Sequence, residues 1–228
     1  MQAVCFDLDW TLSYYPLSTQ QVLQEAFSSA SVPIEWLGDL TTAASHYNDC
    51  WLTLERSAES TDELRFQIIA TLLKEQGISN PAAALAVSRA YGDVRSESGV
   101  LPYPGVDRLL TDLKPNYKLG LLTNGPSDIQ WEKVAALGFD KQFDAIIVAG
   151  DVGIYKPDVR VFEMLLEQLG SNPQHSLFAG DTYDTDIVGA LNTGMHTAWI
   201  VQDDKTLLRG VRPTLMMTET AALREVLL

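Results

Sequence analysis

The chain has 228 residues, of which 46% are hydrophobic and 20% are charged. These proportions are typical of a soluble globular protein with one large domain, or with one core domain and a modest insertion, and they exclude a disordered or fibrous chain. The chain carries 16 Lys and Arg residues against 30 Asp and Glu residues, a formal net charge of −14 at pH 7. Because this charge repels phosphate backbones and anionic lipids, we expect neither a nucleic-acid polymer nor a membrane as a partner.

The N-terminal sequence and the cysteine content favour a cytoplasmic location. The first residues contain no basic segment and include an acidic residue at Asp7, so they do not resemble a secretory signal. No stretch approaches ~18 uninterrupted apolar residues, so we predict no transmembrane helix. We interpret Cys5 and Cys50 as buried thiols in a reducing cytosol.

The first predicted element is a short apolar run, residues 3–8, which contains Asp7 and has the composition of a strand. From about Tyr14 to Ser98 no strand signal follows, and two amphipathic stripes indicate helices. The stripes consist of Val22, Leu23, Ala26, Phe27 and Ala30, and of Leu64, Ile68, Ile69 and Leu72. We predict an all-α cap at residues 14–98, inserted into an α/β core formed by residues 1–13 and 99–228.

The remainder of the chain alternates between predicted strands and helices. Further apolar runs at residues 119–123, 145–148, 177–180 and 197–201 predict strands buried on both faces. One helix is predicted from about Pro126 to Gly138, and another from Pro157 to Gly170. This alternation predicts an α/β fold with a Rossmann-like open parallel sheet. The last apolar run, from Leu215 to Met217, is predicted to be buried core.

Polar side chains lie at the carboxyl ends of three predicted strands. Asp7 and Asp9 end the first, Thr123 and Asn124 the second, and Asp181 the fourth. Ligands of an open α/β sheet bind outside these ends, so we expect these side chains to share one crevice. Taken singly, each is also a common turn or helix-capping residue.

Three carboxylates at one sheet edge repel one another and raise each other's pKa unless a cation lies among them. Hard oxygen ligands that leave room for water and a phosphate suit Mg²⁺, which we predict as the cofactor. Lys156, directly before Pro157, could neutralise the remaining charge of a phosphate. A single lysine is more commonly a solvated surface residue, but the position of this one at the predicted site favours a functional role.

These residues form four ordered motifs. They are Asp7-Leu8-Asp9-Trp10-Thr11 (DxDxT), Leu122-Thr123-Asn124-Gly125, Lys156-Pro157, and the GDxxxxD run from Gly180 to Asp186. With them, the sequence resembles the haloacid dehalogenase-like hydrolase superfamily, in the branch that carries a helical cap after the first strand. The family usually has Gly or another small or polar residue where Trp10 stands. Residues 119–201 look most like its 5′-nucleotidases and N-acylneuraminate-9-phosphatases.

The resemblance implies catalytic and phosphate-binding roles for five residues. Asp7 would attack phosphorus and form an aspartyl-phosphate. Asp9 would protonate the leaving oxygen and then deprotonate the water that hydrolyses the intermediate. Thr123, the backbone N–H of Asn124, and Lys156 would hold the phosphate oxygens, where charge must be stabilised in the transition state.

The resemblance also implies a set of metal ligands. Asp7, the backbone carbonyl of Asp9, and Asp181 would bind Mg²⁺. Asp186 would be a further ligand or would anchor the ligands from behind. Asp184, between the last two, is interpreted as a solvated carboxylate at a helix start.

Five other polar or aromatic residues attract notice. His46, Trp51 and Arg56 lie in the predicted cap and could face a substrate, but surface or core positions are the simpler interpretation. His175 and His196 flank strands away from the motifs, and we assign them no role.

The predicted function is a Mg²⁺-dependent phosphomonoesterase, monomeric or homodimeric, for a small phosphorylated metabolite such as a nucleotide or sugar phosphate. One alternative is a 2-haloacid dehalogenase, in which Asp7 attacks carbon and expels halide; Asp9 and Asp181 would then lack a purpose. Another is a catalytically idle phosphate-binding module, which predicts a broken motif, whereas every expected position is filled. Phosphotransfer to another acceptor, as in a mutase, also stays open.

Overall fold

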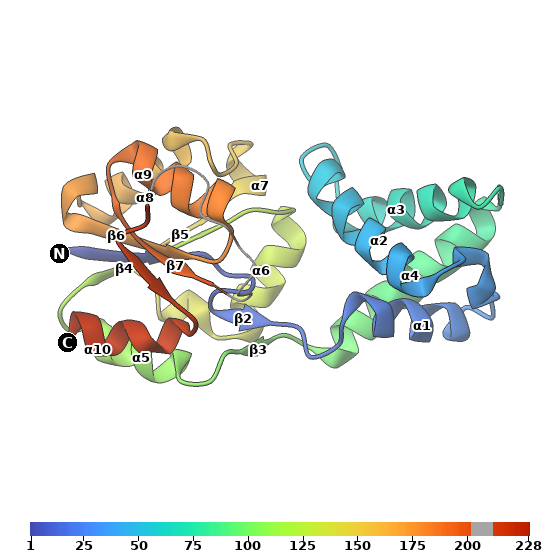
Figure 1. Ribbon diagram of the computed structural model, residues 1–228, viewed down its shortest axis with the longest axis horizontal. Coiled ribbons are helices and arrows are strands. Elements are labelled where there is room, and N and C mark those ends of the chain that lie inside the picture. Colours follow the sequence, from blue (N-terminus) through green and yellow to red (C-terminus); the bar gives the residue numbers. More distant parts are fainter. Residues whose placement is uncertain (202–211) are drawn as a thin grey trace. The chain divides into compact units, whose positions relative to one another are not determined.

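The computed structural model describes residues 1–201 and 212–228 and divides the chain into two compact units. The core unit consists of Met1–Tyr14 and Leu101–Leu228, and the helical unit of Tyr15–Val100. Two hydrophobic clusters lie in the core unit and another lies in the helical unit, and each unit is described separately below (Figure 1).

The core unit is built on a six-stranded sheet with the order β5–β4–β1–β6–β7–β8, in which all paired strands are parallel. The strands are β1 (Ala3–Phe6), β4 (Lys118–Thr123), β5 (Ala145–Val148), β6 (Ser176–Gly180), β7 (His196–Ile200) and β8 (Leu215–Met217). A separate antiparallel pair is formed by β2 (Ser13–Tyr14) and β3 (Leu101–Pro102). The predicted Rossmann-like parallel sheet is therefore confirmed, and β8 is an additional edge strand.

Helices cover both faces of this sheet, because successive strand residues alternate between two hydrophobic clusters. Val4 and Phe6 pack against one set of helices, and Ala3 and Cys5 against the other. The first set is α5 (Val106–Leu113), α6 (Ser127–Ala136) and α10 (Leu223–Leu227); the second is α8 (Val159–Leu169) and α9 (Val188–Thr193). Figure 1 shows α5 and α10 on one side of the sheet and α8 and α9 on the other.

Shorter turns of helix complete the core unit. They are α7 (Ala149–Val152), the 3₁₀ segments η2 (Phe139–Lys141), η3 (Pro173–His175) and η5 (Thr220–Ala222), and the π-helical turn η4 (Tyr183–Ile187). The π-helical turn lies directly after β6, within the predicted GDxxxxD motif. Such turns are rare and frequently occur at functional sites.

The helical unit consists of α1 (Thr19–Ser29), η1 (Ile34–Leu37), α2 (Leu40–Leu54), α3 (Thr61–Glu75) and α4 (Pro81–Ser98). Each α-helix is preceded by a capping residue whose side chain accepts a hydrogen bond from the backbone of the first turn, namely Ser18, Asp39, Ser60 and Asn80. Both predicted stripes pack into one cluster; Ala30, just beyond α1, is partly buried at its margin. Within the described residues, no helix combines the length and the apolar character needed to cross a bilayer.

Several local predictions need correction. Met216 is 51% exposed, because β8 is an edge strand and only Leu215 and Met217 turn toward the core. Cys50 is half-buried, whereas Cys5 is buried as predicted; both are free thiols. The helix predicted from Pro157 begins at Val159, because the Asp158 side chain caps its first turn.

Candidate active site

The strand order determines which loops meet. β1 lies between β4 and β6, and the chain builds outward through β4 and β5 before crossing to β6. The crevice outside the carboxyl ends of the strands at such a switch in direction is where open α/β sheets bind ligands. Asp7 follows β1, Thr123 ends β4 and Asp181 follows β6. The topology therefore brings these three predicted site residues to one edge.

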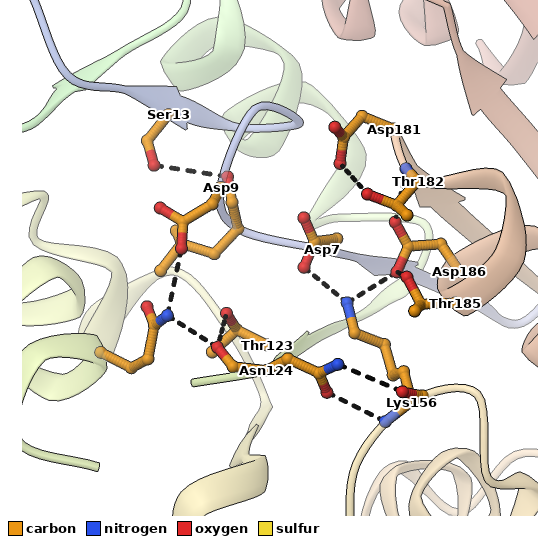
Figure 2. A network of polar contacts seen from close by, with 12 residues as sticks. Asp7, Asp9, Ser13, Thr123, Asn124, Lys156, Asp181, Thr182, Thr185 and Asp186 are labelled. Carbon is orange, nitrogen blue, oxygen red and sulfur yellow. Dashed lines mark hydrogen bonds and ion pairs between the residues drawn. The ribbon is translucent and has the colours of Figure 1, made fainter. Parts of the chain in front are cut away.

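A buried lysine and three carboxylates form the centre of this edge. Lys156 Nζ lies 2.5 Å from Asp7 Oδ1 and 2.7 Å from Asp186 Oδ1. Asp7, Asp181 and Asp186 each offer a carboxylate oxygen, and these oxygens all lie within 4.8 Å of one another. Figure 2 shows the Lys156 side chain directed between Asp7 and Asp186. Lys156 is only 2% exposed, so it is not the solvated surface lysine of the simpler interpretation.

The charges in this cluster do not balance. Three carboxylates face one ammonium, which leaves two negative charges uncompensated when all groups are ionised. Burial, opposed by Lys156 and reinforced by Asp186, raises the pKa of Asp7 to about 7. Burial together with Asp7 and Asp186 raises the pKa of Asp181 to about 8. Burial would lower the pKa of Lys156, but Asp186 and Asp7 outweigh it and hold that pKa above its usual value.

This donor set fits a divalent cation. Two uncompensated charges correspond to one divalent ion, and clustered carboxylate oxygens are the ligands that Mg²⁺ prefers. The Asp9 carboxylate is not in the cluster, so the predicted contact of this residue with the metal would have to use its backbone carbonyl.

Local structure after β6 places Asp186 in this cluster. Asp186 lies in the π-helical turn, and its Oδ2 accepts a hydrogen bond from the Thr182 N–H at 3.0 Å. A Cβ atom at Gly180 would collide with the Asp186 side chain. The glycine of the GDxxxxD motif is therefore required by packing against Asp186. Asp184 is exposed, in agreement with its interpretation as a solvated carboxylate.

Asn124 holds the backbone of Lys156 from the end of β4. Its Oδ1 accepts a hydrogen bond from the Lys156 N–H at 2.9 Å, and its Nδ2 donates to the Lys156 carbonyl at 3.2 Å. The neighbouring Thr123 is 1% exposed, and its hydroxyl donates to the Asn124 carbonyl at 3.2 Å. The sequence analysis predicted a phosphate contact for Asn124 but missed this clamp, which links two motifs 32 residues apart.

Asp9 is bound by two residues that the sequence analysis did not identify. Lys133 Nζ lies 2.8 Å and 2.7 Å from the two Asp9 carboxylate oxygens, and Gln130 Nε2 lies 3.1 Å from Oδ2. Both partners come from α6, the helix that follows the second motif. Lys133 is buried, and a buried lysine requires a partner, but this burial is visible only in the structure.

Trp10 has a backbone conformation that explains the family preference at its position. Its φ angle is +63°, in the left-handed region, and its N–H donates to the Ser13 carbonyl at 2.8 Å. Glycine adopts this region without steric cost, whereas a bulky side chain is strained there. The Trp10 side chain is 46% exposed.

The helical-unit residues considered above have local structural contacts. His46 Nδ1 lies 3.0 Å from Glu75, and the Trp51 ring stacks on Tyr47 with 6.4 Å between centroids. Arg56 is exposed. These observations agree with surface and core positions.

Comparison with known proteins identifies the family. The model of the haloacid dehalogenase-like hydrolases matches residues 1–194. The chain belongs to this family. Its relatives include the pyrimidine 5′-nucleotidase YjjG of Escherichia coli, 34% identical over 128 residues, which are 55% of this chain and 56% of YjjG. The glyceraldehyde 3-phosphate phosphatase of Methanopyrus kandleri is 31% identical over 88% of this chain and 84% of that protein.

The aligned regions cover 56% of YjjG and 46% of the glyceraldehyde 3-phosphate phosphatase of Methanothermobacter thermautotrophicus. The chain therefore spans about half the length of these two curated relatives. Among solved structures of this haloacid dehalogenase-like fold, the putative hydrolase YfnB of Bacillus subtilis, bound to magnesium, has a TM-score of 0.79 at 24% identity, covering 99% of this chain and 98% of YfnB. The L-2-haloacid dehalogenase of Xanthobacter autotrophicus has a TM-score of 0.73 at 19% identity, covering 100% of this chain and 98% of that one. The fold therefore does not choose between phosphatase and dehalogenase; the site must.

Proposed function

We propose that this chain is a Mg²⁺-dependent phosphomonoesterase that hydrolyses a small phosphorylated metabolite through an aspartyl-phosphate on Asp7. The main support for this proposal is the environment of the buried Asp7. Its carboxylate and that of Asp186 both contact the Lys156 ammonium, and Asp181 lies beside them. This arrangement combines a nucleophile, a fixed cation and an acidic ligand set at one edge of the sheet.

The reaction has two steps. In the first, a carboxylate oxygen of Asp7 attacks phosphorus, the bond from phosphorus to the leaving oxygen breaks, and Asp9, which enters this step as the protonated acid, gives that oxygen its proton. In the second, Asp9 takes a proton from a water whose oxygen attacks the same phosphorus. The bond from phosphorus to Asp7 then breaks, which releases phosphate and restores both carboxyl groups to their starting states.

The remaining groups bind the phosphoryl oxygens. We assign this role to the Thr123 hydroxyl, the Asn124 N–H and the Lys156 ammonium. The Lys156 ammonium contacts the carboxylates of Asp7 and Asp186, which fix it at the edge of the sheet where the phosphate would bind. Donors fixed before the reaction stabilise charge on the transferring group without a cost of reorganisation.

The carboxylates of Asp7 and Asp181 would hold Mg²⁺ with the Asp9 carbonyl, and Asp186 would bind it or anchor Lys156. When bound, Mg²⁺ would neutralise the excess carboxylate charge and the charge of the phosphate. The relative with the magnesium-bound structure supports this cofactor.

The names of the relatives support a small phosphate ester as the substrate. They include a pyrimidine 5′-nucleotidase, glyceraldehyde 3-phosphate phosphatases and N-acylneuraminate-9-phosphatases. We propose that the helical unit restricts the substrate to small molecules of this class, and that the protein acts in the cytoplasm as a monomer or homodimer. If intact phosphoproteins or oligonucleotides were hydrolysed faster than nucleotides and sugar phosphates, the restriction would be wrong.

Among the alternatives, a dehalogenase needs no proton donor, because halide leaves as an anion, and it needs no metal held by Asp181 and Asp186. Those two carboxylates and the held Asp9 therefore favour phosphate transfer over halide displacement. An idle binding module has no need of a buried nucleophile, whereas Asp7 is 6% exposed and paired with Lys156.

A panel of phosphate esters, assayed for released phosphate with Mg²⁺ or with chelator, tests the proposal. We expect Mg²⁺-dependent release that Asp7→Asn abolishes and that Asp184→Asn, a matched change at an exposed carboxylate, leaves unchanged. Halide release from 2-haloacids, or phosphate release that survives thorough chelation, would contradict the proposal.

A further inference from the structure

The contacts of Asp9 with α6 lie outside the four motifs. The Asp9 carboxylate binds Lys133 Nζ through both oxygens, at 2.8 Å and 2.7 Å, and Gln130 Nε2 at 3.1 Å. We propose that Lys133 and Gln130 are positioning residues that hold the Asp9 carboxylate for its proton transfers. This inference rests on the proposed function, because it concerns the group that moves the proton in that reaction.

Burial makes Lys133 an effective anchor. Its side chain is 8% exposed, whereas the Asp9 side chain is 30% exposed. A buried ammonium is costly without an anionic partner, and an ion pair that bridges both oxygens of one carboxylate restricts rotation of the carboxyl plane. The Asp9 carboxylate therefore has one solvent-accessible side and one side fixed to α6.

Gln130 connects Asp9 to the phosphate-binding loop. Its Nε2 also donates to the Asn124 carbonyl at 2.7 Å. Both partners of this nitrogen are acceptors, so the amide oxygen cannot take its place and the orientation of the side chain is determined.

Gly125 leaves the space that Gln130 occupies. A Cβ atom at Gly125 would lie 2.6 Å from Gln130 Nε2, and the φ angle of +111° is one that other residues rarely adopt. The glycine of the second motif is therefore needed for the contact of Gln130 with Asp9 as well as for the turn itself. The proton-transfer group and the phosphate-binding loop are in this way held by one side chain.

This arrangement predicts which steps depend on α6. Protonation of the leaving oxygen and deprotonation of water both require the Asp9 carboxylate within hydrogen-bond reach. Attack by Asp7 on an aryl phosphate requires neither, because nitrophenolate leaves without a proton. Loss of Lys133 should therefore slow the first step for alkyl esters and the second step for all esters.

The test compares Lys133→Met with Lys133→Arg, and with Lys141→Met as a control at an exposed lysine. Nitrophenyl phosphate and glycerol phosphate are assayed with Mg²⁺, in the pre-steady state and the steady state. For Lys133→Met we expect a nitrophenol burst close to the wild-type rate, then turnover slowed by roughly 10–100-fold, a fraction of the usual value of acid–base catalysis. Because only the second step is slowed for nitrophenyl phosphate, its KM should fall in proportion to turnover and kcat/KM should stay near wild type. Labelled phosphate should accumulate on Asp7, and Lys133→Arg should restore part of the rate.

Gln130→Met keeps the lysine and should give the same pattern at smaller size, which provides a second variant if Lys133→Met does not fold. If the burst rate and the turnover rate fell equally, the role of Lys133 would be merely structural. If KM rose and the dependence on the leaving group stayed unchanged, Lys133 would be a phosphate ligand. Either result overturns the inference. If the wild-type protein releases phosphate and Lys133→Met matches it, only the inference fails. If the wild-type protein releases none from any ester, the proposed function fails and the inference falls with it.

Discussion

The two units of the chain bury charge in different ways. In the core unit, Asp7, Lys156 and Asp186 are buried together at the carboxyl edge of the sheet. The helical unit has an apolar centre with stacked aromatic rings, such as Tyr47 on Tyr91 at 4.6 Å between centroids, and its buried charged side chains Glu55 and Arg65 have opposite signs. Among the residues that the structure describes, the group of carboxylates able to hold a metal lies in the core unit.

This difference indicates where the chemistry resides. Burial of like charges costs stability, so a fold retains them where they have a use that offsets the cost. The core unit concentrates that cost at one edge, whereas the clusters on both faces of its sheet are apolar. We infer that the core unit performs the reaction and that changes inside the helical unit should affect stability more than chemistry.

The largest expected effect is that of Asp7→Asn. Because this change removes the nucleophile, turnover of any phosphate ester should fall by roughly 10⁴-fold or more, with the fold unchanged. Labelled phosphate, trapped by acid quench and mapped by mass spectrometry, should be found on Asp7 in the wild-type protein and should be absent from the variant. Label on another residue of the variant at the wild-type level would show that the nucleophile is assigned wrongly.

Asp9→Asn should have the next largest effect. It removes the proton donor and base but keeps the nucleophile, so alkyl phosphate turnover should fall by about 10²–10⁴-fold. The phosphorylation step with nitrophenyl phosphate should be slowed less, and phosphoenzyme should accumulate. Rapid-quench measurement of the labelled protein checks this result, with Asp7→Asn as the control that cannot form the intermediate. If phosphorylation of the enzyme were slowed equally with the alkyl ester and with nitrophenyl phosphate, the result would argue against proton donation by Asp9.

The pH dependence of stability should reveal the uncompensated carboxylates. Burial raises the pKa of Asp7 to about 7 and of Asp181 to about 8, whereas an unfolded Asp titrates near ~3.9. Between about pH 4 and pH 8 these groups bind more protons in the folded state, so their contribution to the free energy of unfolding decreases as pH rises. Asp181→Asn should therefore gain stability relative to the metal-free wild type toward pH 8.

Mg²⁺ should reverse this difference, because it stabilises the ionised carboxylates of the wild-type protein. Urea unfolding of the two proteins at several pH values, with chelator or with Mg²⁺, measures both effects. A stability difference between them that does not vary with pH in chelator would mean that Asp181 titrates normally in the folded chain.

The smallest effect on chemistry should come from a cavity in the helical unit. Phe27 of α1 is fully buried in the hydrophobic cluster of the helical unit. Phe27→Ala should lower the free energy of unfolding of that unit by about 3–5 kcal/mol. At temperatures where the unit stays folded, nitrophenyl phosphate turnover should remain within about threefold of wild type. Phe178→Ala, at a buried core position beside Lys156, is the matched comparison and should reduce turnover as well. Equal loss of turnover in both variants would break the distinction between the units.

Much of the fold could be predicted from local patterns. Apolar runs predicted β1, β4, β5, β6 and β7, because strands buried on both faces need continuous hydrophobicity. Leu64, Ile68 and Leu72 predicted the buried face of α3 from helical spacing. β8 was missed as a strand because it is short and lies at the edge, where Met216 is exposed. The helix predicted to start at Pro157 starts instead at Val159, because Asp158 is the residue that caps the first turn of α8.

The sequence also determined which motif residues meet. Asp7, Thr123 and Asp181 converge because the parallel strands β1, β4 and β6 end at one edge, whatever residues occupy the loops. Only the tertiary structure showed that Lys133 and Gln130 bind the Asp9 carboxylate and that the Asn124 side chain hydrogen-bonds to the backbone of Lys156. Lys133 is 124 residues from Asp9, and their meeting depends on how α6 packs beside the end of β1. No periodicity or motif spacing encodes such a contact, because it is set by the packing of whole elements rather than by local backbone geometry.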